Sequence, residues 1–274
     1  MVKEKKTYFV SSDIHSYYDE YLFSLSQQGF DINNPNHILI ICGDLFDRGP
    51  KSKELLDFLL NLPEDRRILI RGNHEDLLLD IFNDGYIKSY DVSNGTVNTI
   101  TNICQCDKSF VFSNLKACYE ILQMEGLFEL IDSMKNYYEI GDYIFVHGWI
   151  PTKHELSPTM YLVHRPNKDW RNADSEDWED SRWTNGIQAF YSNCGEKGKT
   201  IVCGHWHTSY GHARRQYKKL TDKEYSKLEF GEDACFDIFE HTRYNKSIIA
   251  LDACTAHSGK VNAFKLENTN DLSH

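Results

Sequence analysis

The chain has 274 residues, and its 41% apolar and 13% aromatic content is typical of a globular protein with a sizeable core. A net charge of −11 argues against a protein that binds nucleic-acid duplexes or anionic membranes, because such proteins need a basic face. We find no CxxC pair, cleavable leader or membrane-spanning run in the sequence, and we therefore expect a reduced, cytoplasmic environment.

Strands and helices alternate along the first third of the chain. Continuous apolar runs such as 37–42 predict buried strands, and apolar residues at helical spacing, as in 51–61, predict helices. The predicted order is strand 7–10, helix 18–28, strand 37–42, helix 51–61, strand 67–70 and helix 76–83. This alternation predicts parallel strands connected by crossover helices.

Two segments interrupt the alternation. Residues at about 86–136 have apolar positions at helical spacing and predict a mainly helical insertion. Residues at about 151–198 show no clear period, and we expect a loop-built, cap-like insertion, since long irregular segments are usually functional. Further strands are predicted at 143–146, 200–203, 247–251 and 261–266. We predict one α/β domain that covers 1–274 and contains both insertions.

Residues that can bind metal ions or transfer protons follow five of the predicted strands. The five stretches are SSDIH (11–15), GDLFDRG (43–49), RGNHE (71–75), HG (147–148) and GHWH (204–207). Open α/β sheets place ligand sites at the carboxyl ends of strands, so we expect the five stretches to meet. Strand alternation predicts that Asp13 and His15 share one face, as do His205 and His207. A single such stretch could be an ordinary turn, but five together favour one site.

The five stretches, in this order, resemble the motifs of the calcineurin-like metallophosphoesterase superfamily. GDLFDRG and RGNHE resemble its phosphoprotein phosphatase branch, which contains bacterial Ser/Thr protein phosphatases and symmetrical diadenosine tetraphosphate hydrolases. The tail IIALDACTAHSGKVNAFKLE is similar to the closing strands of that branch. The resemblance implies an αββα sandwich, with two mixed β-sheets flanked by helices, to which helical and loop-rich insertions are added here.

The resemblance also implies a centre of two divalent metal ions. The implied ligands are Asp13, His15 and His207 for the first ion, Asn73, His147 and His205 for the second, and Asp44 as a bridge. Two ions about 3.5–4 Å apart would supply a bridging hydroxide for in-line attack on a phosphate ester. Oxygen and imidazole ligands without thiolate favour Mn, with Fe, Zn or Ni as alternatives. Because the ions would make the centre positive, the expected partner is a phosphorylated substrate.

The remaining site residues receive their roles from the same resemblance. His74 would protonate the leaving-group oxygen and Asp47 would orient its ring. Arg48 would bind phosphate oxygens, with Asn73 as a further substrate contact. The branch adds a second phosphate-binding arginine before the last histidine motif. Arg182 is the candidate, with Arg165 and Arg171 as rivals.

Several residues near the motifs leave alternatives open. His207 supplies a second histidine in GHWH that the branch generally lacks. Glu75 is expected to cap or brace the following helix, and Arg71 could bind substrate or form a structural ion pair. The five tryptophans at 149, 170, 178, 183 and 206 could stack a nucleobase or pack within the cap.

The predicted function is metal-dependent hydrolysis of phosphate monoesters, with Ser/Thr phosphoproteins as substrates. The alternative is hydrolysis of dinucleoside polyphosphates or other nucleotides at the same centre. A non-catalytic scaffold is disfavoured by the complete set of implied ligands, and a nuclease by the net charge of −11.

Overall fold

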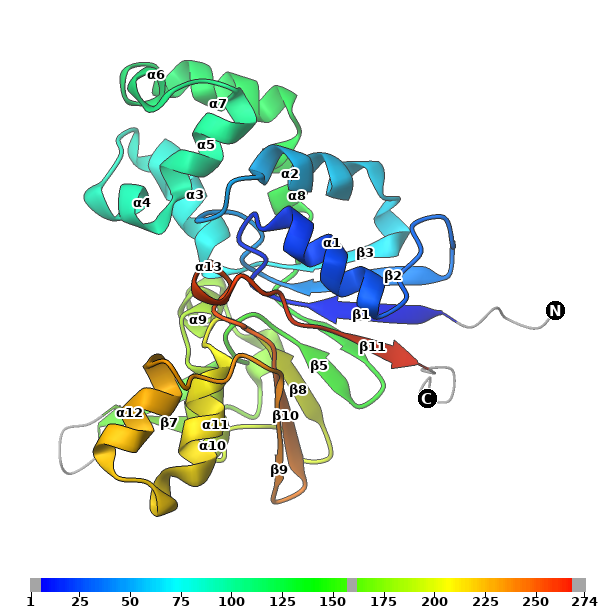
Figure 1. The fold of residues 1–274 in the computed structure, drawn as a ribbon, viewed down its shortest axis with the longest axis vertical. Coiled ribbons are helices and arrows are strands. Elements are labelled where there is room, and N and C mark those ends of the chain that lie inside the picture. Colours follow the sequence, from blue (N-terminus) through cyan, green and yellow to red (C-terminus); the bar gives the residue numbers. More distant parts are fainter. Residues whose placement is uncertain (1–5, 157–161, 268–274) are drawn as a thin grey trace.

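A computed structural model describes the protein at residues 6–156 and 162–267 (Figure 1). The strands are β1 (Thr7–Ser11), β2 (His37–Cys42), β3 (Arg67–Ile70), β4 (Tyr138–Ile140), β5 (Tyr143–Phe145), β6 (Thr152–Leu156), β7 (Leu162–Pro166), β8 (Thr200–Cys203), β9 (Phe239–Arg243), β10 (Lys246–Ala250) and β11 (Ala263–Glu267). The α-helices are α1 (Tyr18–Gln27), α2 (Ser52–Asn61), α3 (Asn73–Asp84), α4 (Ser89–Asn94), α5 (Thr96–Cys104), α6 (Lys108–Ser113), α7 (Leu115–Met124), α8 (Leu127–Asp132), α9 (Ser175–Arg182), α10 (Gly186–Tyr191), α11 (Thr208–Gln216), α12 (Asp222–Phe230) and α13 (Thr255–Ser258). Short 3-10 turns are η1 (Glu64–Arg66), η2 (Trp170–Asn172) and η3 (Tyr217–Lys219).

The strands form two mixed sheets and one separate hairpin. The first sheet has the order β11-β1-β2-β3, in which β1, β2 and β3 are parallel and β11 is antiparallel to β1. The second has the order β4-β5-β8-β10-β9, with three parallel central strands and an antiparallel strand at each edge. β6 and β7 form the antiparallel hairpin. This arrangement confirms the predicted αββα sandwich.

Three clusters of apolar side chains separate the layers of the sandwich. Phe9 and Leu39 on one face of the first sheet pack with α1, α2, α3 and the helices of the 86–136 segment. Val10 and Ile40 on the opposite face pack against Val202 of the second sheet. A third cluster joins the far face of the second sheet to the 151–198 segment. Because both faces of β2 are buried, its sequence is a continuous apolar run.

Helix α3 begins three residues earlier than its sequence predicts. The Gly72 N–H donates to Glu75 Oε2 over 2.8 Å, and this bond closes the first helical turn. Asn73 and His74 therefore lie on the first turn of a helix rather than in a loop. The predicted capping role of Glu75 is confirmed.

The prediction that residues 151–198 are loop-built is wrong. This segment contains the β6–β7 hairpin and the helices α9 and α10. Asp174 and Asn185 precede these helices, and each side chain accepts a hydrogen bond from a backbone N–H of the first turn. The caps compensate for a sequence that is too polar to show a helical period. No helix among residues 6–156 and 162–267 is long and apolar enough to cross a membrane.

The two groups of added helices lie on different sheets. In Figure 1, α4–α7 stand beside α2 and α3, whereas α10, α11 and α12 lie with the second sheet. The carboxyl ends of the central strands lie between these two groups. Loops from both halves of the chain therefore converge at one edge of the sandwich.

Candidate active site

Backbone hydrogen bonds connect the loops that follow the strands at this edge. The Asp13 N–H donates to Gly43 O over 3.1 Å, and the Gly204 N–H donates to His147 O over 2.8 Å. The Thr255 hydroxyl donates to Asp13 O over 2.7 Å, which ties the last loop to the first. The predicted meeting of the strand ends is confirmed.

The loops have a strained backbone where the predicted site residues lie. Left-handed φ values occur at Asp13 (52°), His15 (51°), Asp44 (54°), Asp47 (73°), Arg48 (60°) and His205 (63°). Residues other than glycine rarely take such values, and this strain concentrates at functional sites. Gly43 also has a positive φ of 81°, and a Cβ there would lie 2.5 Å from His147 Nδ1. The loop can approach the imidazole this closely because residue 43 has no side chain.

Strand alternation does not set the side-chain directions in the pairs Asp13/His15 and His205/His207. β1 ends at Ser11 and β8 ends at Cys203, so all four residues lie in the loops beyond. The prediction that Asp13 and His15, or His205 and His207, share a strand face is wrong. Their directions are set by the left-handed turns at Asp13, His15 and His205 instead.

Asn73, His147 and His205 gather around Asp44, and we call these four residues the second ligand group. Asn73 Oδ1 lies 2.8 Å from His147 Nε2 and 3.0 Å from His205 Nδ1. Asp44 Oδ1 lies 3.2 Å from His147 Nε2. Asp44, His147 and His205 come from three different loops and Asn73 from the first turn of α3, and their potential ligand atoms face one another.

The protons of the two imidazoles point away from the centre of the second ligand group. His147 Nδ1 donates to Cys42 O over 2.8 Å, because a carbonyl can only accept, so His147 Nε2 carries a lone pair. The His205 ring is held in the same way by the backbone of Trp183. Burial lowers the pKa of His147 and lowers that of His205 to about 3, so both rings are neutral. Converging lone pairs with no proton between them favour a cation.

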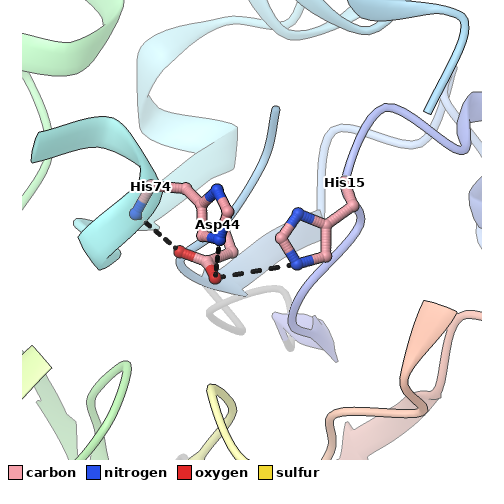
Figure 2. Close-up of side chains that lie close together, drawn as sticks. All are labelled: His15, Asp44 and His74. Atoms are coloured by element: carbon pink, nitrogen blue, oxygen red, sulfur yellow. Dashed lines mark hydrogen bonds and ion pairs between the residues drawn. The ribbon is translucent and has the colours of Figure 1, made fainter. Parts of the chain in front are cut away.

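His15, Asp44 and His74 form the first ligand group, shown in Figure 2. Asp44 Oδ2 lies 3.7 Å from His15 Nε2 and 3.9 Å from His74 Nε2. His15 Nδ1 donates to Phe46 O over 2.9 Å, and burial lowers the pKa of His15 well below its usual value. Its Nε2 therefore presents a lone pair toward Asp44.

Asp13 lies beside this group but points toward the last histidine motif. Both of its carboxylate oxygens are 3.1 Å from the His205 N–H, and Ser12 donates its hydroxyl to Oδ2. Burial raises the pKa of Asp13 well above its usual value, and the charges of Asp252 and Asp44 raise it further. An anion at Asp13 thus needs a cation nearby.

Asp252 is a site residue that the motifs do not reveal. It is 7% exposed, and burial raises its pKa to about 6. Its Oδ1 accepts from the Cys254 N–H over 2.7 Å. Asp252 follows β10 in LDAC as Asp13 follows β1, so the rule of polar residues after strands could have identified it.

The donor set fits a pair of divalent cations that share Asp44. Burial raises the pKa of Asp44, but the neighbouring imidazoles, His147 first, outweigh this effect and hold it below its usual value. Asp44 is therefore ionised and contacts both ligand groups. Asp13 and His15 could hold one ion, and Asn73, His147 and His205 could hold the other. Neutral imidazoles with carboxylate and amide oxygens suit first-row divalent metals.

His74 and Asp47 form a buried hydrogen-bonded pair next to the ligand groups. His74 Nδ1 donates to Asp47 Oδ2 over 2.7 Å, and His74 Nε2 lies 3.1 Å from an Arg48 guanidinium nitrogen. Burial alone would lower the pKa of His74, but the charge of Asp44 and the bond to Asp47 outweigh it and raise the pKa. The exposed Arg48 side chain is free to contact an anion in front of the ring. This arrangement suits a proton donor beside a phosphate-binding group.

Helix α5 holds Asp47 in place. Thr96 donates its hydroxyl to Asp47 Oδ2 over 2.7 Å, and Thr99 donates to Asp47 Oδ1 over 2.8 Å. The Asp47 N–H in turn donates to Thr99 Oγ1 over 2.9 Å. The helical 86–136 segment therefore positions the carboxylate that orients His74, which the sequence does not indicate.

Replacing Thr96 with valine is expected to lower kcat about tenfold while leaving the metal content unchanged, since one bond to a charged carboxylate is lost. The measurement is steady-state hydrolysis of an alkyl phosphate together with elemental analysis for metals. Thr101→Val is the matched control, because Thr101 lies on the same helix and donates to Asn98 O instead. Equal losses in both variants would contradict a positioning role for Thr96.

The three candidate arginines all have acidic partners. Arg182 is 6% exposed and donates to Asp76 Oδ2 over 2.5 Å and to Asn136 Oδ1 over 3.0 Å. Arg71 donates to the other oxygen of Asp76 over 2.6 Å, so Arg71 forms the structural ion pair rather than lying free. The rivals lie elsewhere, Arg165 on Glu155 over 2.7 Å and Arg171 on Glu139 and Glu196. Substrate binding by Arg182 stays a prediction.

His207 lies outside both ligand groups among the described residues. Its Nδ1 is 2.5 Å from Ser209 Oγ, whose own hydroxyl donates to Glu229 O over 2.6 Å. His207 Nδ1 therefore carries the proton, and Nε2 keeps a lone pair. Metal ligation by His207 stays a prediction. The left-handed turn at His205 directs the His205 and His207 side chains to different places.

Comparisons with known proteins agree with this geometry. A model of the calcineurin-like phosphoesterase family matches residues 7–248. The asymmetrical bis(5'-nucleosyl)-tetraphosphatase of Bacillus subtilis is 30% identical over 120 residues, which cover 41% of this chain and 49% of that protein. The symmetrical bis(5'-nucleosyl)-tetraphosphatase of a Buchnera aphidicola strain is 37% identical over 76 residues, 28% of this chain and 26% of that protein. The chain thus spans about half or less of the length of these curated relatives.

Solved structures show the same fold at low identity. The cold-active protein-tyrosine phosphatase of a psychrophilic Shewanella matches with a TM-score of 0.51 and 17% identity, over 96% of this chain and 76% of that one. The family match covers the strand ends that hold both ligand groups, from Asp13 to His205. From its fold, its site and this match, the chain belongs to the calcineurin-like phosphoesterase family.

Proposed function

We propose that this chain hydrolyses the phosphate bonds of dinucleoside polyphosphates or related nucleotides at a centre of two divalent metal ions. The observation that carries the proposal is the set of neutral imidazoles whose lone pairs converge on Asp44, next to a buried His74–Asp47 pair. Bound metal ions supply a nucleophile at neutral pH and neutralise charge on the phosphoryl oxygens.

The side chains of this protein divide the remaining work. Arg48 binds phosphate oxygens in front of His74, because its guanidinium lies 3.1 Å from His74 Nε2. Because a guanidinium only donates, His74 Nε2 accepts from Arg48 in the free protein. When Arg48 turns to the phosphate, protonated His74 donates from Nε2 to the leaving oxygen, while Nδ1 stays bonded to Asp47. Asp47 keeps the ring oriented and favours its protonated form, and Thr96 and Thr99 hold the Asp47 carboxylate in place.

Nucleotides and Ser/Thr phosphoproteins are the two substrate classes to distinguish. Two curated relatives are named for the hydrolysis of bis(5'-nucleosyl) tetraphosphates, which favours nucleotides for this chain. A phosphoprotein is the second candidate, because GDLFDRG and RGNHE resemble a branch that contains Ser/Thr protein phosphatases as well as diadenosine tetraphosphate hydrolases. Manganese is the metal we propose, with iron, zinc or nickel as alternatives, because all ligands are oxygen or imidazole.

A substrate panel tests the proposal. With Mn²⁺ added, we expect kcat/KM for diadenosine tetraphosphate to exceed that for a phosphothreonine peptide by at least about tenfold, with p-nitrophenyl phosphate as a reference for the bare chemistry. A chelator should abolish all three activities, because the ligand groups contribute no nucleophile of their own. Preference for the phosphopeptide would reject the nucleotide class, and activity that survives chelation would reject the metal centre.

A further inference from the structure

Trp183 differs from the other tryptophans in its exposure. Trp149, Trp170 and Trp178 are 1%, 2% and 3% exposed and pack in the core of the second sheet. The Trp206 indole is partly buried, and its Nε1 is enclosed. Trp183 is 52% exposed, although it directly follows the buried Arg182 and precedes the buried Thr184. An indole of this size at the surface is therefore free to contact a ligand.

The backbone that carries Trp183 is fixed to the second ligand group. Its N–H donates to Asp180 O over 3.1 Å, and its backbone holds the ring of His205. The preceding turn is packed against Gly148, where a Cβ would come within 2.7 Å of Arg182 O. The indole consequently projects from a rigid position beside a candidate metal ligand rather than from a loose loop.

The Trp183 ring lies nearly perpendicular to the His205 ring. Their ring centroids are 5.9 Å apart and the planes meet at 84°. Planes at this angle show that the indole is not stacked on the imidazole. The exposed part of the Trp183 indole is thus an apolar ring surface beside His205, a member of the second ligand group.

We propose that Trp183 stacks on a nucleobase of the substrate and thereby selects nucleotides over other phosphate esters. A ligand that stacks on Trp183 while its phosphate is bound needs a planar ring close to that phosphate. A nucleotide has both a planar base and a phosphate. The base carries no net charge, so it can bind the indole of a protein with a net charge of −11 without repulsion. This inference rests on the proposed function and adds the residue that recognises the base.

Kinetic variants test the selection. Trp183→Ala is expected to lower the ratio of kcat/KM for diadenosine tetraphosphate to kcat/KM for glycerol 2-phosphate by about tenfold, mainly through KM of the nucleotide. Trp183→Phe should retain most of the ratio, because phenylalanine keeps a π-face. Phe23→Ala, which removes an exposed ring from α1, is the control and should leave the ratio unchanged. Equal losses on both substrates, or a loss confined to a phosphothreonine peptide, would overturn the proposal.

A binding measurement separates this inference from the proposed function. In a His74→Asn background, which should bind but not turn over substrate, diadenosine tetraphosphate is expected to quench tryptophan fluorescence. Adding Trp183→Phe should remove the quenching with little change in affinity measured by calorimetry, and adding Trp183→Ala should weaken both. If the wild type hydrolyses no nucleotide but this pattern holds, the proposed function fails and base stacking stands. If quenching persists without Trp183, base stacking fails.

Discussion

Replacing His74 with asparagine is expected to lower kcat by about 10²–10⁴-fold on an alkyl phosphate, since the leaving oxygen then departs without a proton. The loss should be much smaller on p-nitrophenyl phosphate, whose leaving group departs as a stable anion. Asparagine can still accept or donate near Asp47, so the local packing is retained. The measurement is kcat on both substrates with elemental analysis of bound metal.

The contrast between leaving groups distinguishes a proton donor from a metal ligand. His74 Nε2 lies 3.9 Å from Asp44 Oδ2, close enough that ligation of a metal is the competing role. If His74 is a general acid, the variant should still bind two metal ions per chain. If His74 is a metal ligand, the variant should lose one ion together with its activity. Loss of metal together with equal losses on both substrates would assign His74 to the first ion. His257→Asn, at an exposed histidine outside the five stretches that follow the strands, is the matched control.

Replacing Asp44 with asparagine is expected to lower turnover by about 10³-fold or more and to remove metal from both ligand groups. Asp44 contacts His15 through Oδ2 and His147 through Oδ1, so its charge serves both groups at once. Without this charge the neutral imidazoles have no shared anion opposite them. Metal content by elemental analysis and turnover in Mn²⁺ should fall together.

An exposed aspartate provides the control for this variant. Asp19→Asn removes one negative charge from α1, where the Asp19 side chain forms an ion pair with Lys51. It should leave metal content and turnover unchanged. If Asp44→Asn kept two metal ions per chain, the bridging role of Asp44 would be wrong.

Much of the fold follows from the sequence because its central strands are apolar on both faces. The runs at 37–42 and 200–203 predict β2 and β8 at the same bounds, since burial on both sides leaves no polar position to blur them. The edge strands β4 and β9 are shorter or more polar, and the sequence does not indicate them. Helix α9 is also polar and has no apolar residues at helical spacing, and its Asp174 cap stabilises its first turn. The sequence therefore does not indicate it either.

The residues of the candidate site are predicted better than their geometry. Asn73, His147 and His205 meet around Asp44 as the motifs imply. The alternation of side chains along a strand does not predict the directions of His15 and His205, because each lies in a left-handed turn beyond its strand.

Contacts made across long sequence distances could not be predicted. Thr96 and Thr99 reach Asp47 from an insertion that carries no recognised motif. Arg182 meets Asp76 over 106 positions of sequence, and only the folded chain brings them together. The high exposure of Trp183 could not be predicted either, because nothing in the sequence distinguishes it from the other four tryptophans.

The most direct test of a two-metal centre is anomalous diffraction from crystals of the protein grown with Mn²⁺. We expect two anomalous peaks, one in contact with Asn73, His147 and His205 and the other in contact with His15, with Asp44 touching both. A single peak, or a pair of peaks that does not share Asp44, would contradict the dinuclear centre on which the proposed function depends.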